Sequence, residues 1–436
     1  MREYSDILLI SATLMLSACN DPVSGPEEHA GTAPKLPDAQ QFLVPPMNIT
    51  NPVGWKSGEL PTVPTGFIIS AFATNLNGPR NILPLANGDV LAVEAGGPSG
   101  EPVTRPKDIV YKFVKGKAHS PVKPGNRVVL LHDTNGDGQA DEKTVLIGKL
   151  HSPFGIVLVG EALYVAETDQ IVRYAYVPGQ KTIIEAGSVL CMLPAGEINH
   201  HWTKSLTASP DGTKLYVGIG SNSNIVERGM GAEADRARIW EVDIKTGAVR
   251  PYATGLRNPN GLTFQPGTGK LWAVVNERDE LGNNLVPDYM TSVKEGGFYG
   301  WPWSYFGNHV DIRVKPERPD MVSKAIVPDF SLGPHVAPLG LAFNTSNAFP
   351  AHYANGAFVG EHGSWDRTVL NGFDVAFVAF ENGKPAGKPE VFVGGFADKD
   401  NNARGRPVGV AFDDKGALYI ADDVGNVVWR VAAEPH

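Results

Sequence analysis

One arrangement of apolar and polar positions recurs along the whole chain. A small or polar residue, often next to Pro, leads through a Gly or polar position into an apolar strand, which a turn links to a second apolar strand. Short apolar runs separated by turn residues predict β-hairpins. The copies occupy residues 78–93, 152–166, 201–217, 258–274, 337–359 and 406–421.

The number and spacing of these copies predict the fold class. They extend from about residue 66 to the C-terminus, at intervals longer than the roughly 40–45 residues of the shortest propeller repeats. A β-sandwich or a solenoid would also contain hairpins. However, sandwiches seldom repeat one signature six times, and solenoids repeat at shorter intervals. We therefore predict an all-β, six-bladed β-propeller with long inter-strand loops.

The same alignment predicts where a ligand would bind. The residue before the first strand of each copy should lie near one end of the central channel, because every blade enters the ring in the same orientation. These positions hold Arg80, His151, His201, Asn258, His335 and Arg406.

Composition agrees with a β protein and excludes nucleic acid as a partner. The chain of 436 residues contains 49 Gly and 35 Pro, but only 19% charged residues. That balance suits short strands and tight turns. The net charge of −9 lacks the basic surface that phosphates require.

The N-terminus predicts export. Arg2 precedes an apolar stretch over residues 7–16, which is too short to span a bilayer but long enough for a signal peptide. Leu16-Ser17-Ala18-Cys19 resembles a bacterial lipobox, so we expect residues 1–18 to be a signal peptide and Cys19 to carry lipid. An ordinary signal peptide is the alternative, because Glu3 and Asp6 are unusual in such a segment.

The rest of the chain then divides into two parts. Residues 19–50 are expected to form a flexible lipoprotein tether and residues 51–436 the propeller. The protein would be a periplasmic or cell-envelope lipoprotein that contacts the membrane only through its lipid. With Cys19 lipidated, Cys191 is left without an internal disulfide partner. No Cys-x-x-Cys-His motif for covalent haem occurs, so electrons from any oxidation must pass to an external acceptor, a quinone or a cytochrome.

A polar loop over residues 133–141 resembles a calcium-binding loop. Oxygen donors stand at the first, third, fifth and ninth positions, with Gly138 at the sixth. The Glu expected at the twelfth position is replaced by Thr144, and no flanking helices are evident. The loop predicts either a structural calcium or a polar turn without metal. The proposed ligands are Asp133, Asn135, Asp137 and Asp141.

The third, fourth and sixth copies begin with residues of types that can act in catalysis or bind a ligand. A neutral imidazole at His201 would be a suitable general base, and several converging arginines would bind an anionic planar ligand. Each residue, taken singly, could instead be structural or solvated. The arginines are Arg257, Arg404 and Arg406.

These motifs resemble the soluble PQQ-dependent sugar dehydrogenases, most closely the sorbosone dehydrogenase-like branch. The resemblance covers nearly all six copies. It is most specific over residues 201–224, 255–288, 299–302, 361–367 and 404–409. It implies pyrroloquinoline quinone (PQQ) and calcium as cofactors. It also implies oxidation of a sugar, a sorbosone-like aldehyde or a polyol.

The resemblance also implies roles for individual residues. His201 matches the catalytic base, and Arg257 matches an arginine that stabilises negative charge on the cofactor. Asn258 matches a cofactor contact, and Arg404 and Arg406 match a pair that grips the cofactor carboxylates.

The calcium segment departs from the family pattern. The family holds calcium partly through main-chain carbonyls, which fall at Arg278 and Asp279, where the glucose-oxidising members have Gly-Pro. A cofactor-binding lysine aligns with Asp366, which leaves Arg367 as the nearby cation. His200 replaces the acidic residue before the catalytic histidine. These departures make glucose itself an unsafe assumption for the substrate.

Other functions remain open at this level. His335 and His362 are further channel residues, either facing substrate or structural. A calcium-dependent propeller hydrolase or lactonase is one alternative, although its metal would need a cluster of acidic and amide side chains. A non-catalytic binding propeller is the other.

Overall fold

The computed structural model confirms the six-bladed propeller. It describes residues 23–435 except 43–44, 99–101, 106–107, 110–111, 113–115 and 117–119. The predicted signal peptide and Cys19 therefore lie outside the described residues. Among the described residues, no helix is both long enough and apolar enough to cross a membrane.

The first three blades are consecutive four-stranded antiparallel sheets. Blade 1 contains β3 (Pro79–Pro84), β4 (Val90–Glu94), β5 (Arg127–His132) and β6 (Glu142–Ile147). Blade 2 contains β7 (Gly155–Val159), β8 (Ala162–Ala166), β9 (Gln170–Ala175) and β10 (Ser188–Met192). Blade 3 contains β11 (Leu206–Ala208), β12 (Lys214–Ile219), β13 (Arg238–Asp243) and β14 (Val249–Thr254).

Blades 4 and 5 carry additional elements. Blade 4 contains β15 (Pro259–Phe264), β16 (Leu271–Val275), β17 (Pro287–Ser292) and β20 (Phe330–Pro334). Between β17 and β20 lie β18 (Ser304–Tyr305), β19 (His309–Val310) and α3 (Pro319–Val322). Blade 5 contains β21 (Pro338–Phe343), β22 (Gly356–Glu361), β23 (Asp374–Glu381) and β25 (Glu390–Val393), with β24 (Lys384–Pro385) beside β23.

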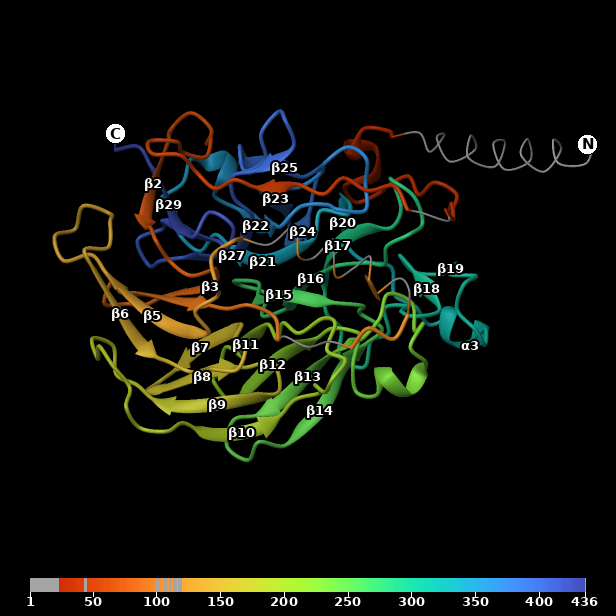
Figure 1. The fold of residues 1–436 in the computed structure, drawn as a ribbon, viewed down its shortest axis with the longest axis horizontal. Coiled ribbons are helices and arrows are strands. Elements are labelled where there is room, and N and C mark those ends of the chain that lie inside the picture. Colours follow the sequence, from red (N-terminus) through yellow and green to blue (C-terminus); the bar gives the residue numbers. More distant parts are fainter. Residues whose placement is uncertain are drawn as a thin grey trace, which may run out of the picture.

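Blade 6 closes the ring by joining the two ends of the chain. Its strands β27 (Pro407–Phe412), β28 (Leu418–Asp422) and β29 (Val427–Ala433) come from the C-terminal part of the chain. Its outermost strand, β2 (Phe67–Ala73), comes from the N-terminal part and pairs antiparallel with β29, Phe67 opposite Ala433. Figure 1 shows the blades around the ring, with β2 and β29 side by side.

The core consists of apolar layers between neighbouring blades. One cluster joins Leu91 and Val128 of blade 1 to Ile156 and Leu163 of blade 2, and similar clusters fill the other junctions. The second strand of each blade is buried on both faces. In five of the blades this strand contains only buried residues; these strands are β4, β8, β16, β22 and β28. Burying one such side chain contributes roughly 1.5–3 kcal/mol. The apolar runs in the sequence are therefore continuous because both faces of these strands pack against another blade.

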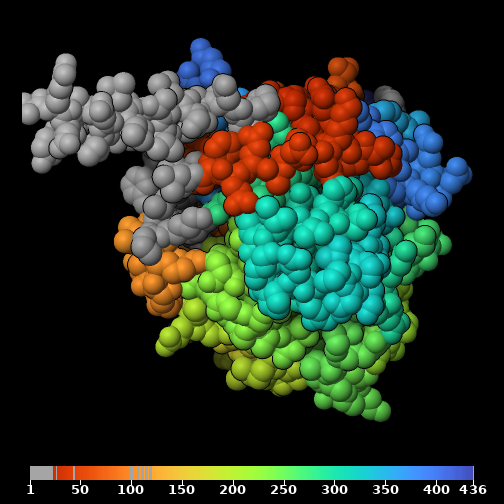
Figure 2. Space-filling view, turned by 90° about the vertical axis from the view of Figure 1, so that its right-hand side faces the viewer, coloured from red at the N-terminus to blue at the C-terminus, as the bar shows by residue number. Residues whose placement is uncertain are grey.

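The N-terminal segment packs on the propeller, although the sequence predicted a flexible tether. His29 is buried beside β20, where the Oγ of Ser331 donates to the carbonyl of His29 at 2.5 Å. Further along, β1 (Asn51–Pro52) pairs with β26 (Asn402–Ala403). In Figure 2 this segment, in red, lies on the surface above the cyan insertion between β17 and β20. Proline and acidic residues suggested disorder, but docking onto the finished propeller supplies contacts that the segment alone lacks. A role as a lipoprotein tether remains a prediction.

Candidate active site

A cavity of about 1140 Å³ opens where the blades meet, at the end of the channel where the innermost strands begin. The predicted convergence is seen, because five of the six pre-strand positions line this cavity: His151, His201, Asn258, His335 and Arg406. Arg80 does not line the cavity but is linked to it through one other side chain. Its guanidinium bonds to Asp423 at 2.5 Å, and Asp423 contacts the cavity residue His362.

Buried carboxylates at the end of the second strand hold these rim positions. In three blades such a carboxylate accepts a hydrogen bond from the backbone amide before the first strand. A carboxylate bond to a buried N–H is among the stronger hydrogen bonds, so the rim loop is fixed relative to its blade. The bonds run from Asn77, His151 and Arg406 to Glu94, Glu167 and Asp422, at 2.8, 2.9 and 2.8 Å.

His201 is arranged as a neutral base. Its Nδ1 lies 2.8 Å from the carbonyl oxygen of Ser221, so Nδ1 must carry the proton and Nε2 the lone pair. Burial lowers the pKa of His201 well below its usual value, and the positive charge of Arg257 lowers it further. An imidazole in this state can accept a proton at neutral pH.

Gly220 allows His201 and Asn258 to approach each other. A Cβ on Gly220 would lie 2.3 Å from Oδ1 of Asn258 and 2.5 Å from Cβ of His201. Asn258 is buried, and its Oδ1 has no hydrogen-bond partner in the part of the chain that the structure describes. The cavity wall therefore presents an unsatisfied amide oxygen next to the histidine.

Arg257 lines the cavity as a rigid, buried cation. Its side chain is 3% exposed, and Nη2 contacts Asp279 Oδ2 at 3.2 Å. It also donates to the carbonyl of Glu277 at 2.6 Å and to Oδ1 of Asn224 at 3.0 Å. These bonds hold the guanidinium in one orientation.

Arg406 is a second buried guanidinium in the wall, and the groups that contact it are uncharged. Nη2 donates to Oγ1 of Thr50 at 2.8 Å, and Nη1 lies 3.3 Å from Nδ1 of His362. The ring of Phe373 lies under Cζ at 4.8 Å. Burial lowers the pKa of His362 to about 4, outweighing the opposing charge of Asp423, so His362 is neutral. Arg406 therefore gives the cavity a positive charge without a carboxylate in direct contact.

Three of the predicted residues direct their side chains away from the cavity. Arg367 is 1% exposed and donates to the carbonyl of Ser24, in the N-terminal segment, at 3.0 Å. Arg404 points toward Glu59, with Nε 3.9 Å from its carboxylate. Arg278 was expected to act through its carbonyl. Its fully buried side chain pairs with Glu277 and Asp311, at 3.1 Å in each case.

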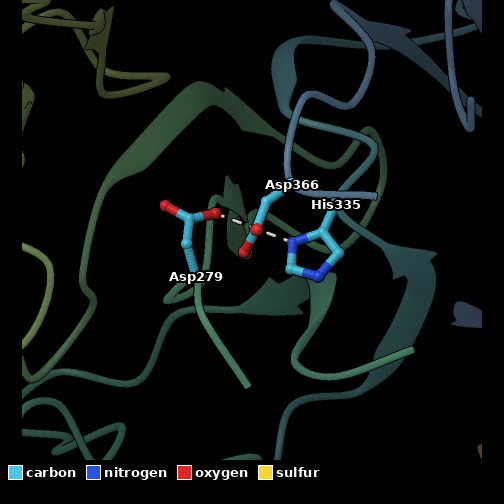
Figure 3. Close-up of side chains that lie close together, drawn as sticks. All are labelled: Asp279, His335 and Asp366. Carbon is cyan, nitrogen blue, oxygen red and sulfur yellow. Dashed lines mark ion pairs between the residues drawn. The ribbon is translucent and has the colours of Figure 1, made fainter. Parts of the chain in front are cut away.

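Asp279, His335 and Asp366 come together at the cavity wall. Their ligand atoms lie within 4.8 Å of one another, and Figure 3 shows the three side chains pointing toward one another. Oδ1 of Asp366 is buried without a hydrogen-bond partner among the described residues. This cluster uses the side chain of Asp279, whereas the resemblance implied its carbonyl. That carbonyl accepts bonds from Asn224 and Arg313 at 3.1 and 3.2 Å.

The charges within this cluster depend on one another. Burial opposes protonation of His335, but the hydrogen bond to Asp279 and the charge of Asp366 outweigh it and raise the pKa of His335 to about 9. Burial raises the pKa of Asp366 to about 7. His335 also has a φ of 59°, a left-handed conformation rare outside glycine and frequent at functional sites.

The polar loop over residues 133–141 lies on the β5–β6 hairpin, and none of its residues lines the cavity. Its oxygens bond to the loop's own backbone. Asp133 accepts from the amides of Gly136 and Gly138 at 2.7 and 2.8 Å, and Asp141 accepts from Thr134. These bonds explain the turn geometry without a metal. A structural calcium there remains a prediction.

Sequence reasoning named His362 as a channel residue but missed its partner Asp423. His362 and Asp423 directly follow the last residues of β22 and β28, so both occupy the same place in their blades. An alignment of the second strands, in addition to the first, would have shown this equivalence. Asp366 was noted only as a departure from the family pattern. Its meeting with His335 depends on how the long loop between β22 and β23 folds over the short link between β20 and β21.

Comparison with known proteins gives one family match and several structural neighbours. The family model described as TrAA12-like matches residues 123–294 and 318–434, more than half of the chain. The "Pyrroloquinoline quinone-dependent sugar dehydrogenase" of Hypocrea jecorina is 22% identical over 375 residues, 74% of this chain and 84% of that protein.

Two solved structures show the same fold. The holo PQQ domain of pyranose dehydrogenase from Coprinopsis cinerea has a TM-score of 0.69 and 18% identity, covering 88% of this chain and 100% of that one. The calcium structure of Trichoderma reesei carbohydrate-active enzymes family AA12 has a TM-score of 0.70 and 20% identity, covering 89% and 99%. The chain thus belongs to the TrAA12-like family, within the wider group of soluble PQQ-dependent sugar dehydrogenases that its motifs resemble.

Proposed function

We propose that this protein is a PQQ- and calcium-dependent dehydrogenase that oxidises a sugar, a sorbosone-like aldehyde or a polyol. The observation that carries this proposal is the pairing, in one cavity, of a neutral, partly buried histidine with two buried guanidinium groups. Family membership supports the oxidoreductase class, and the names of the relatives support a sugar-like substrate.

The residues present fit an anionic, planar cofactor. The guanidinium of Arg406 makes its hydrogen bonds to Thr50 and His362 and to no carboxylate among the described residues, and its Nε has no partner there. Arginine suits planar carboxylate ligands because its donors form a rigid fork. Arg257 and the free Oδ1 of Asn258 would contact polar atoms elsewhere on such a cofactor. When bound, PQQ would supply the electron acceptor for the oxidation.

The residues also fit a divalent cation. Calcium prefers oxygen ligands, so Asp279 and Asp366 are the side chains that would hold it, one of them through the unpartnered Oδ1. His335 donates through Nε2 to the carbonyl of Gly282 at 3.1 Å, which leaves Nδ1 facing Asp279. His335 would thus orient Asp279.

In the proposed reaction the protein contributes a proton acceptor and a positive environment. Nε2 of His201 would take the proton of the substrate hydroxyl, while Nδ1–H stays bonded to Ser221. Arg257 would stabilise negative charge that develops near the base, since its orientation is already fixed. The electrons would then pass to an external quinone or cytochrome.

The proposal is tested by reconstitution. Chelator-treated protein is titrated with PQQ in the presence and absence of Ca²⁺, and dye reduction is followed with aldoses, sorbosone and polyols. His201→Asn keeps a donor for Ser221 and removes the base, so we expect kcat to fall about 10²–10⁴-fold with PQQ affinity nearly unchanged. His352→Ala is the matched control, because that histidine is exposed and bonds to Glu390 on the outer part of blade 5. Failure of the wild-type protein to bind PQQ would refute the proposal.

A calcium-dependent hydrolase or lactonase is a second candidate, because the Asp279–His335–Asp366 cluster is made of side chains. A metal held in this way could activate water. Metal-dependent hydrolysis of a lactone or ester panel without PQQ would favour this function over dehydrogenation.

A further inference from the structure

The part of the N-terminal segment that contains β1 reaches the wall of the cavity. We call residues 45–53 the strap. Its Asn48 amide donates to the carbonyl of Trp365 at 3.0 Å, and the amide of Val53 donates to the carbonyl of Ala403 at 2.8 Å. Because Trp365 lines the cavity and Ala403 lies just before Arg406, the strap fastens two parts of the site together.

Thr50 is the strap residue whose side chain bonds to a cavity arginine. It is completely buried, and its Oγ1 accepts a hydrogen bond of 2.8 Å from Nη2 of Arg406. The bond joins residues 356 positions apart in the sequence. Thr50 thus belongs to the surroundings of the cavity cation although it lies outside the propeller blades.

The position of Arg406 depends on few contacts. Phe373 lies under the guanidinium, His362 lies beside Nη1, and Thr50 is the hydrogen-bond partner of Nη2. The face of the Phe373 ring limits tilting of the Arg406 guanidinium but does not limit rotation of the guanidinium in its own plane. The two hydrogen bonds to Thr50 and His362 fix that rotation, and the bond to Thr50 is the shorter.

We propose that Thr50 is a positioning residue that aligns Arg406 to bind a carboxylate of the cofactor, so that the strap is part of the active site. This inference rests on the proposed function. It extends the site to a segment that precedes the first blade.

The test compares Thr50→Val with Thr50→Ser. Valine preserves shape and removes the hydroxyl, whereas serine retains it. We expect Thr50→Val to weaken PQQ binding to the calcium-loaded protein about tenfold or more, as for the loss of a hydrogen bond to a charged group. Thr50→Ser should bind within about twofold of wild type. Thr291→Val is the matched control, because Thr291 is also fully buried but bonds to Asp329 in blade 4.

A second ligand separates positioning from a general structural effect. PQQ methylated on its carboxyl groups offers Arg406 no anion, so Thr50→Val and wild type should bind this ester equally. Equal weakening of both ligands, or PQQ affinity of Thr50→Val within twofold of wild type, would overturn the inference. Wild-type protein that does not bind PQQ would refute the proposed function instead, which keeps the two failures apart.

Discussion

Replacing Gly220 with alanine should remove most of the activity by separating His201 from Asn258. The added Cβ would lie 2.3 Å from Oδ1 of Asn258 and 2.5 Å from Cβ of His201, whereas ordinary contacts begin at 3.4 Å. One or both residues must therefore move by roughly 1 Å, which at an active site costs about 100-fold in rate. Gly220 has no positive φ, so alanine meets only this steric conflict.

The free energy of unfolding should change less than the rate. Overpacking of this kind costs about 1–3 kcal/mol, which urea denaturation measures, whereas kcat/KM for dye reduction should fall about 100-fold. Gly231→Ala is the matched control in the same blade, because its added Cβ would meet nothing within 4 Å. The reasoning is refuted if Gly220→Ala retains kcat/KM within twofold of wild type.

Three further predictions concern pH, the cation and the remote loop. Burial and the charge of Arg257 lower the pKa of His201 below 6.5, so the base stays deprotonated in mild acid. The acid limb of the kcat/KM profile should therefore lie below pH 6.5. A limb centred above that pH would contradict the assignment of His201 as the base. Asp366→Asn should weaken Ca²⁺ binding, measured by calorimetry, about tenfold or more. The asparagine can still accept a hydrogen bond from the amide of Glu280, but it lacks the negative charge. Unchanged affinity would exclude Asp366 as a ligand. Asp133→Ala removes two amide bonds and should cost about 1–2 kcal/mol of unfolding free energy without altering activity. Greater stabilisation by Ca²⁺ of wild type than of this variant would show that the loop binds the ion.

The sequence by itself determined the blades and the end of the channel where the site lies. Blades 1 to 5 are each built from one continuous stretch of the chain, and blade 6 takes three of its four strands from one such stretch, so the apolar pattern mostly reflects contacts between near neighbours in sequence. The repeat also fixes the orientation of each blade, which is why the repeat alone assigns His201, Asn258 and Arg406 to one end of the channel, where all three line the cavity.

The tertiary structure alone decided which neighbouring side chain enters that cavity. Arg404 and Arg406 are two positions apart, yet Arg404 faces Glu59 and Arg406 faces the cavity. Likewise, Asp279 and Asp366 meet only because long loops of different blades pack against each other. Thr50 reaches Arg406 because the strap docks across the segments that hold Trp365 and Ala403. Such contacts join residues far apart in the chain, and a local repeat pattern carries no information about them.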